Sequence, residues 1–286
     1  MKYILNLKKI SKKDIAIAGG KGASLGEMTR LRQGFGGQVQ AGIPVPPGFV
    51  VSASAFDKFY GSAIPEDLAK EILAEFKKLK TKYVAVRSSA TAEDSLSASW
   101  AGQLETYLNI GERDLLKSIE KCRASIDSPR ARAYRLQKKL NKKKISVAVV
   151  VQKMIPSEFS GVCFTANPVT GDRSEMIIEA GRGLGEAVVG GKITPDAYII
   201  SKTKNLILDK NISIQKIKIM GIGQGTKEKS VSKNLQDKQK LGDKHILKLA
   251  NICQKIETHY KAPQDIEWSF AKGKFYILQS RPITTL

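Results

Sequence analysis

The chain has 286 residues, of which 42% are hydrophobic and 26% charged, a composition typical of a globular protein with one large domain or two lobes. No apolar run approaches the ~20 residues that a membrane span needs, and the N-terminus lacks the pattern of a signal peptide. The three cysteines are scattered without the spacing of metal ligands, which favours reduced thiols and a cytoplasmic location.

The chain carries a formal net charge of +21. Such an excess is typical of proteins that meet nucleic acid, an acidic membrane surface or an anionic small substrate. The lysines are spread along the sequence without interleaved aromatic residues, and no zinc-finger, RNP or KH motif accompanies them. We therefore interpret most of them as solvated surface. A basic nucleic-acid-associated protein is kept as an alternative, which would show steep salt dependence of binding to duplex DNA.

The first predicted element is a glycine-rich turn that runs into a helix within residues 14–31. Three glycines surround Lys21, so the backbone can approach a phosphate while Lys21 supplies a positive charge at the helix N-terminus. The spacing of a Walker A motif is absent, and an ordinary turn and helix start is the alternative. Leu25 and Met28 are expected to pack inward.

A buried strand is predicted from Val84, and its end carries Arg87 followed by small hydroxyl residues. A cation at the end of a strand, followed by small donors, suits an edge that holds phosphate, although the same residues also suit a turn with a cap. The next strand, over residues 101–109, is entered through Gly102.

The longest apolar β run, residues 145–155, predicts a strand at the centre of a sheet. Gln152 and Met154 lie where this run leaves the core, a position that often forms a hinge against a flat ligand. The glycine-rich segment 181–186 lacks the spacing and the acidic partner of a dinucleotide-binding turn. The remaining elements are helices near 53–61, 65–80, 112–140 and 243–260, strands near 160–165 and 176–180, and a hairpin with an exposed linker over 205–245.

The C-terminus predicts a β-hairpin, because residues 264–270 and 275–281 both alternate apolar with polar side chains. A three-residue loop of Lys-Gly-Lys sets Glu267 opposite Gln279 and Asp265 opposite Arg281. The other face would then collect the apolar side chains of Ile266, Trp268, Phe270, Tyr276 and Leu278. One face is core, and the other gathers an acid, an amide and a guanidinium. A solvated face with a surface ion pair is the alternative.

Taken together, these stretches resemble the ATP-grasp nucleotide-binding domain of the phosphoenolpyruvate synthase, pyruvate phosphate dikinase and rifampicin phosphotransferase family. The stretches that carry the resemblance include GGKGASLGEM, GIPVPPGFVV, AVRSSATAED, AGQLETYLNI and QDIEWSF with YILQSRP. They come in the order of the family and cover residues 1–284. The resemblance implies an α+β ATP-grasp fold over 1–286, with lobes of about 1–140 and 141–286 whose mixed and antiparallel sheets clamp a nucleotide.

Carried over residue by residue, the resemblance implies a site for ATP and Mg²⁺. Lys21 and Arg87 would hold the phosphates, and Gly102 and Thr106 would lie beside them. The adenine would meet Gln152 and the backbone near Met154. Mg²⁺ would be bound by Glu267 and Gln279, while Arg281 would meet the terminal phosphates. Lys21, Arg87 and Arg281 are therefore the residues implied to be catalytic.

The resemblance also implies a phosphotransferase that passes a phosphoryl group from ATP to a histidine on a separate, swivelling domain, as in phosphoenolpyruvate synthase. The sequence ends before that domain and the acceptor domain, and neither His245 nor His259 lies in the phosphohistidine motif. We therefore expect a half-enzyme whose partner supplies the histidine in trans. A donor domain like that of rifampicin phosphotransferase and a non-catalytic nucleotide-binding module are the alternatives. The polar loop 32–40 looks inserted relative to the family and is expected near Lys21.

Overall fold

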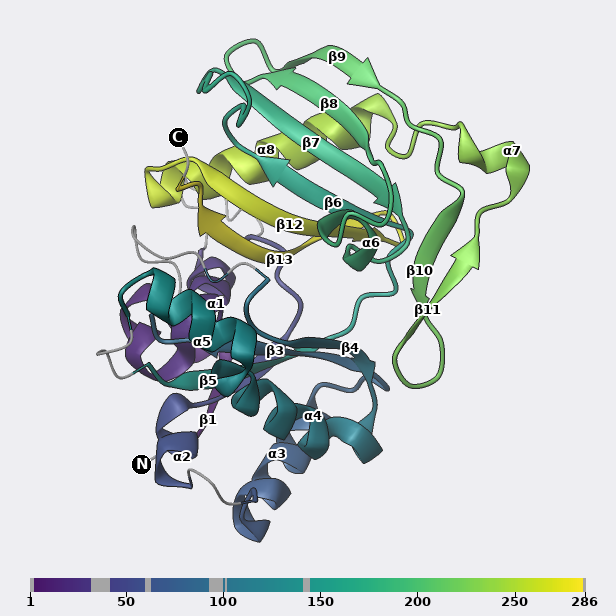
Figure 1. The fold of residues 1–286 in the computed structure, drawn as a ribbon. Helices are drawn as coiled ribbons and strands as arrows, with labels where there is room; N and C mark the ends of the chain where they lie inside the picture. The colour runs from purple at the N-terminus through teal and green to yellow at the C-terminus, as the bar shows by residue number, and fades with distance from the viewer. Residues whose placement is uncertain are drawn as a thin grey trace. The chain divides into compact units, whose positions relative to one another are not determined.

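The computed structural model describes residues 3–31, 42–59, 63–92, 100, 102–140 and 145–284. The chain divides into two compact units (Figure 1). Unit 1 comprises residues 1–32, 46–154 and 223–225, and unit 2 comprises residues 33–45, 155–222 and 226–286. The expected lobes were 1–140 and 141–286; the strand of residues 147–153, expected in the second lobe, belongs to the sheet of unit 1. The predicted loop 32–40 lies outside the described residues.

Unit 1 is built on a five-stranded sheet in which every neighbouring pair is antiparallel. Its strands, in their order across the sheet, are β1 (Ile4–Asn6), β2 (Gly48–Val51), β5 (Val147–Lys153), β3 (Val84–Ala90) and β4 (Thr106–Ile110). The apolar run of β5 therefore lies at the centre of the sheet, as the sequence predicted. A strand buried on both faces has no polar face to alternate with, which explains its continuous valines.

Helices cover both faces of this sheet. They are α1 (Ile15–Arg30), α2 (Ala53–Lys58), α3 (Glu66–Lys78), α4 (Glu112–Ala124) and α5 (Pro129–Gln137). The helix predicted over 112–140 is in fact divided, because Ser128 accepts a hydrogen bond from the backbone of Ala131 and caps a new helix with Pro129 at its first position. One sheet face, with Val86 and Val151 fully buried, forms the main core with α2, α3 and α4.

Unit 2 contains a six-stranded antiparallel sheet and one long helix. The strands, in order, are β13 (Lys274–Pro282), β12 (Gln264–Ala271), β6 (Phe159–Phe164), β7 (Glu175–Arg182), β8 (Asp196–Ser201) and β9 (Leu206–Asn211). The helix α8 (Asp243–Tyr260), whose bounds match the predicted ones, lies across one face of the sheet (Figure 1). Its buried side chains recur at helical spacing, at Ile246, Leu249, Cys253 and Ile256.

The C-terminal hairpin confirms the two predicted pairs and the burial of Ile266, Trp268 and Phe270, and it corrects the turn and the apolar residues of β13. Glu267 lies opposite Gln279, and Asp265 lies opposite Arg281. The turn, however, contains only Lys272 and Gly273, both at positive φ. Such a two-residue turn matches the twist of the strands better than the expected three-residue loop.

A β-bulge reconciles this shorter turn with the predicted polar pairs. Trp268 pairs with Ile277, so Leu278 is an extra residue in β13. The buried residues of β13 are consequently Phe275 and Ile277, and the expectation that Tyr276 and Leu278 lie in the core is wrong. Burying Phe275 in place of Tyr276 keeps a hydroxyl out of the core.

The predicted hairpin and linker between β9 and α8 contain β10 (Ile217–Gly221), β11 (Thr226–Ser230) and the short helix α7 (Lys233–Gln236). A buried ion pair ties this segment to β8, since Lys240 Nζ lies 2.7 Å from Asp196 Oδ1 and neither side chain is exposed. The Tyr198 hydroxyl and the Lys240 amide both donate to Asp196 Oδ2. Because both oxygens of the carboxylate have protein partners, its burial is tolerated.

Candidate functional site

One face of the sheet in unit 1 carries three of the residues that the sequence singled out there. The register pairs Arg87 with Thr106 on one side and with Val150 on the other, and it pairs Ala85 with Gln152. Since side chains alternate along a strand, Arg87, Thr106 and Gln152 project from the same face, opposite to the core of Val86 and Val151. We call it the Arg87 face.

Lys21 is brought to the Arg87 face by α1. This helix contacts β3 and β5, and a Cβ on Gly22 would lie 3.2 Å from Val50 Cγ2. The helix is interrupted at Gly19, which has φ 70° and ψ 173°. Residues from Gly20 onward therefore form a separate helical segment with Lys21 in its first turn. The predicted combination of a glycine turn, a lysine and a helix N-terminus is confirmed, and the turn is in addition preceded by a helical segment that begins at Ile15.

Two predicted positions at the end of β5, Gln152 and Met154, already make hydrogen bonds within the protein. The buried side chain of Gln152 donates from Nε2 to the carbonyl of Pro46 at 3.2 Å. The amide of Met154 donates to the carbonyl of Tyr83 at 3.1 Å, so a ligand at this hinge would have to use other backbone groups. Gly102 is exposed at φ +67°, with no atom within 4 Å of the position of a Cβ. It precedes β4, which carries Thr106.

The hairpin of unit 2 presents two oxygen-bearing side chains opposite one another, those of Glu267 and Gln279. Gln279 is buried, and Glu267 is half-buried. Mg²⁺ prefers oxygen ligands and is usually held by one or two carboxylates together with phosphate oxygens and waters. The donor set therefore fits this ion. Among the described residues, no group of three or more His, Cys, Asp or Glu side chains could hold a metal alone.

Arg281 lies two residues beyond Gln279 on the same strand and forms an ion pair with Asp265. Its Nε and Nη2 donate to Asp265 Oδ2 at 2.9 and 2.5 Å. Burial raises the pKa of the Asp265 carboxyl, with the Arg281 guanidinium acting in the opposite direction and the Glu267 charge adding to the rise. The pair fixes the orientation of the guanidinium beside the two candidate metal ligands.

Glu179 belongs to the same row of side chains, and the sequence reasoning missed it. Val162 pairs with Glu267, and the register between β6 and β7 sets Val162 in line with Glu179. The side chain thus projects from the same face as Glu267, two strands away and roughly 10 Å by backbone spacing. Burial, and next the charge of Asp265, raise the pKa of its carboxyl. A lone acid inside the apolar run of β7 was the available signal.

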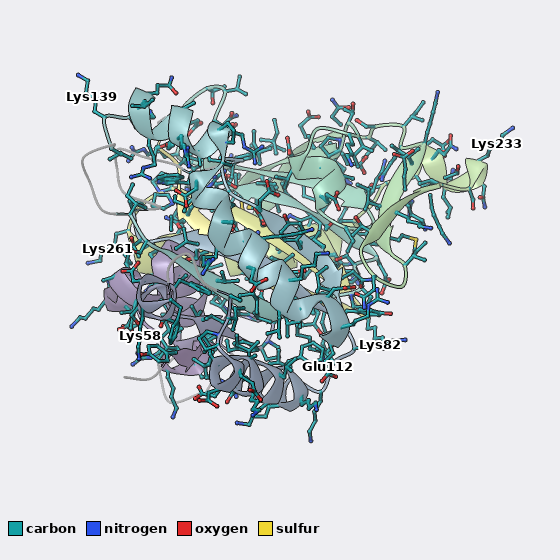
Figure 2. The ribbon with its side chains drawn as sticks, turned by 60° about the horizontal axis from the view of Figure 1, so that its bottom comes forward. Lys58, Lys82, Glu112, Lys139, Lys233 and Lys261 are labelled. Carbon is teal, nitrogen blue, oxygen red and sulfur yellow. The ribbon has the colours of Figure 1, made fainter. Side chains whose placement is uncertain are left out.

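The excess of positive charge is spread over the described surface. Figure 2 shows Lys58, Lys82, Lys139, Lys233 and Lys261 pointing away from the ribbon, each on a different element or connection. All five side chains are exposed. This distribution agrees with the interpretation of most lysines as solvated surface. No helix in the described part of the chain has the length and apolar character to cross a membrane.

The family described as pyruvate phosphate dikinase, AMP/ATP-binding domain, matches residues 15–64 and 57–286 of the chain. The chain belongs to this family. The predicted α+β class is confirmed, and the two units built on antiparallel sheets have the organisation expected of an ATP-grasp domain.

Relatives with known names match over the full length of the chain. A probable phosphoenolpyruvate synthase from Methanocaldococcus jannaschii is 41% identical over 330 residues, which cover 100% of this chain and 27% of that protein. A rifampicin phosphotransferase from Bacillus subtilis is 36% identical over 322 residues, covering 99% and 36%. The chain spans less than half the length of these relatives. Among solved structures, a D-alanine–D-alanine ligase from Helicobacter pylori matches with a TM-score of 0.34 and 12% identity, covering 76% of this chain and 48% of that one.

Proposed function

We propose that this chain binds ATP with Mg²⁺ and acts as the donor domain of a phosphotransferase like phosphoenolpyruvate synthase. The observation that carries the proposal is the pairing of Glu267 with Gln279 beside Arg281 in a chain that belongs to the AMP/ATP-binding family. An amide, a carboxylate and a guanidinium side by side suit a metal-bound polyphosphate. A solvated ion pair alone would not require the buried amide of Gln279.

In this proposal the cations of the Arg87 face bind and orient phosphate groups. Arg87 is buried in the sheet, so its guanidinium is held in place, and Lys21 stands in the first turn of a helix whose N-terminal dipole also favours an anion. Thr106 and Gly102 would contribute polar contacts at the edge of the Arg87 face. Gln152 and the backbone near Met154 would contact the adenine.

Glu267 and Gln279 would supply the protein ligands of Mg²⁺, and Arg281 would contact the terminal phosphates. When bound, Mg²⁺ neutralises part of the negative charge on the phosphate oxygens. Phosphoryl transfer depends mainly on positioning and on stabilising that charge. The three cations and the two oxygen ligands would perform these tasks without a nucleophilic side chain from this chain.

Titration calorimetry with Mg-ATP, and with ATP in EDTA, tests the proposal. At concentrations near 100 Kd, Mg-ATP should stabilise the fold by about 2.7 kcal/mol, which corresponds to a rise of a few degrees in Tm. Removal of Mg²⁺ should weaken binding. The absence of both heat and a melting shift with millimolar Mg-ATP would rule out the nucleotide assignment.

Glu267→Gln tests the metal ligands, because it preserves shape and removes one charge. It should reduce the difference in affinity between Mg-ATP and free ATP while leaving the fold intact. Glu228→Gln on the exposed strand β11 is the matched control, with the same chemical change on a different sheet, and should keep the difference. Unfolding of Glu267→Gln would instead mark Glu267 as a structural residue.

The acceptor histidine would come from a separate domain, either of a longer protein or of a partner chain. Adding a purified histidine domain of a phosphoenolpyruvate synthase and labelled ATP should yield acid-labile, base-stable phosphate on that domain. The histidine domain of a rifampicin phosphotransferase would be tested in the same way. Labelling of that domain alone would favour a donor domain like that of rifampicin phosphotransferase. ATP binding without labelling of either would favour a non-catalytic nucleotide-binding module. We further propose a cytoplasmic location, supported by three buried cysteines with free thiols.

A further inference from the structure

The interruption of α1 is fastened to β3 by one hydroxyl. Ser89 Oγ donates to the carbonyl of Ala18 at 2.8 Å and accepts from the amide of Gly22 at 3.1 Å. Ala18 and Gly22 lie on opposite sides of the break at Gly19. The same oxygen therefore binds the end of one helical segment and the first turn of the next.

The amide of Gly22 is one of the donors that the start of a helix leaves without a carbonyl partner in the helix. Such donors are normally capped by a side chain just before the helix. Here the cap comes from a strand 67 residues further along the chain. Ser89 is completely buried, so water does not compete for these hydrogen bonds.

The backbone at Gly19 packs so closely against Ser89 that only glycine fits at this position. A Cβ at Gly19 would lie 2.2 Å from both the carbonyl oxygen and the Oγ of Ser89, a distance that no side chain tolerates. Gly19 also has φ +70°, which favours glycine. The break in α1 is thus held at a fixed distance from β3.

Ser89 and Arg87 share one face of β3, two residues apart. We propose that Ser89 is a positioning residue for Lys21: it fixes the helical segment that carries the lysine, so that a single strand places both cations of the Arg87 face. This inference rests on the proposed ATP-binding function. Ser89 itself need not touch the nucleotide.

The neighbouring Ser88 provides a matched control. It is as buried as Ser89 but faces the opposite side of the sheet, where its Oγ lies 2.9 Å from the carbonyl of Cys122 and 3.0 Å from Ser125 Oγ. Loss of either hydroxyl removes buried hydrogen bonds, so both substitutions should lower Tm. Only the loss of Ser89 should affect Lys21.

A double-mutant cycle tests the inference through the Kd for Mg-ATP, measured where circular dichroism shows each variant folded. Ser89→Ala should weaken binding on the order of tenfold, and Ser88→Ala should leave it unchanged. In a Lys21→Met background, Ser89→Ala should have no further effect on Kd although it still lowers Tm. If Ser89→Ala does not fold, Ser89→Cys, which keeps a weak donor and acceptor, takes its place.

Three results would overturn the inference. The first is an unchanged Kd in the Ser89 variant while the wild type binds Mg-ATP. The second is an equal loss of affinity in the Lys21→Met background, which would show that Ser89 acts independently of Lys21. The third is a wild-type chain that does not bind Mg-ATP, which would remove the proposed function together with the inference.

Discussion

Glu267 and Gln279 lie directly opposite one another, and the next pair toward the turn is Trp268 with Ile277, so that Leu278 is extra in β13. The bulge allows the two ends of the hairpin to have different pairing registers. The open end of the hairpin keeps its polar side chains in register, and the closed end buries Phe275 and Ile277. A β-bulge that adjusts the direction of side chains beside a polar site is a common arrangement.

Because of the bulge, Ile277 should contribute more to the stability of the fold than Leu278, the opposite of what the unbulged register would give. Ile277→Ala should lower the free energy of unfolding by about 2–4 kcal/mol, because the side chain is fully buried. Leu278→Ala should cost about 1 kcal/mol or less, since Leu278 is only half-buried. Urea denaturation of both variants measures the difference. A larger loss for Leu278→Ala would favour the unbulged register instead.

The turn offers a stabilising substitution. Lys272 has φ 51°, a conformation that asparagine tolerates better than lysine. Lys272→Asn should raise the free energy of unfolding by about 0.5–1 kcal/mol. Lys274→Asn, the same change on the exposed first residue of β13, is the control and should give no gain, because asparagine is a poor strand residue. Thermal denaturation of the two variants measures the change in stability. Equal changes for Lys272→Asn and Lys274→Asn would contradict the assignment of Lys272 to the turn.

The buried ion pair between Lys240 and Asp196 predicts a strong asymmetry. Lys240→Met should cost about 3–5 kcal/mol, because it leaves a buried carboxylate without its cation. Adding Asp196→Asn to that variant should recover part of the loss, since the amide is neutral. Chemical denaturation at neutral pH measures both steps. A double variant less stable than Lys240→Met alone would show that hydrogen bonding to Asp196 outweighs the charge.

Glu179 predicts a pH dependence of stability. Its pKa in the folded protein is raised above the ordinary value of 4.5 by burial and by the charge of Asp265. The folded state therefore holds this proton more tightly than the unfolded chain does. Proton binding by Glu179 therefore contributes to the free energy of unfolding. This contribution is fully present below pH 4.5 and is lost as the pH rises through the raised pKa.

Glu179→Gln removes this titration. The variant should gain stability relative to the wild type as the pH rises from 4.5 toward neutrality, and the difference should then level off. Urea denaturation across that range at fixed ionic strength provides the measurement. A difference that stays constant, or that falls with rising pH, would contradict the raised pKa.

The sequence predicted those features that periodicity controls. The continuous valines of β5 indicated a central strand, and the helix expected near 243–260 is α8. The polar pairs of the hairpin were also predicted, since acid, amide and guanidinium alternate with large apolar residues. Each of these patterns lies within one segment of the chain. The burial of one face of that segment is enough to explain the pattern.

Features that depend on a distant partner escaped prediction. The contact between Ser89 and the two sides of the turn at Gly19 joins distant segments, and the choice of Ile277 over Leu278 for the core depends on a one-residue difference in turn length. Glu179 could be recognised as a site neighbour only once the order of β12, β6 and β7 was known. No pattern within a single segment contains that information.

The edge strand β9 of unit 2 has two features that disfavour pairing with another chain. β9 is the last strand of its sheet, and Leu208 is an extra residue there, since Ile199 pairs with Asp209 and Ile200 with Ile207. The free edge of a flat strand is a template on which another chain can add, and such growth leads to fibrils. A bulge twists the edge, and the charges of Asp209 and Lys210 follow at once. The bulge and these two charges therefore disfavour the addition of another strand at β9, although Leu206 and Leu208 are exposed there.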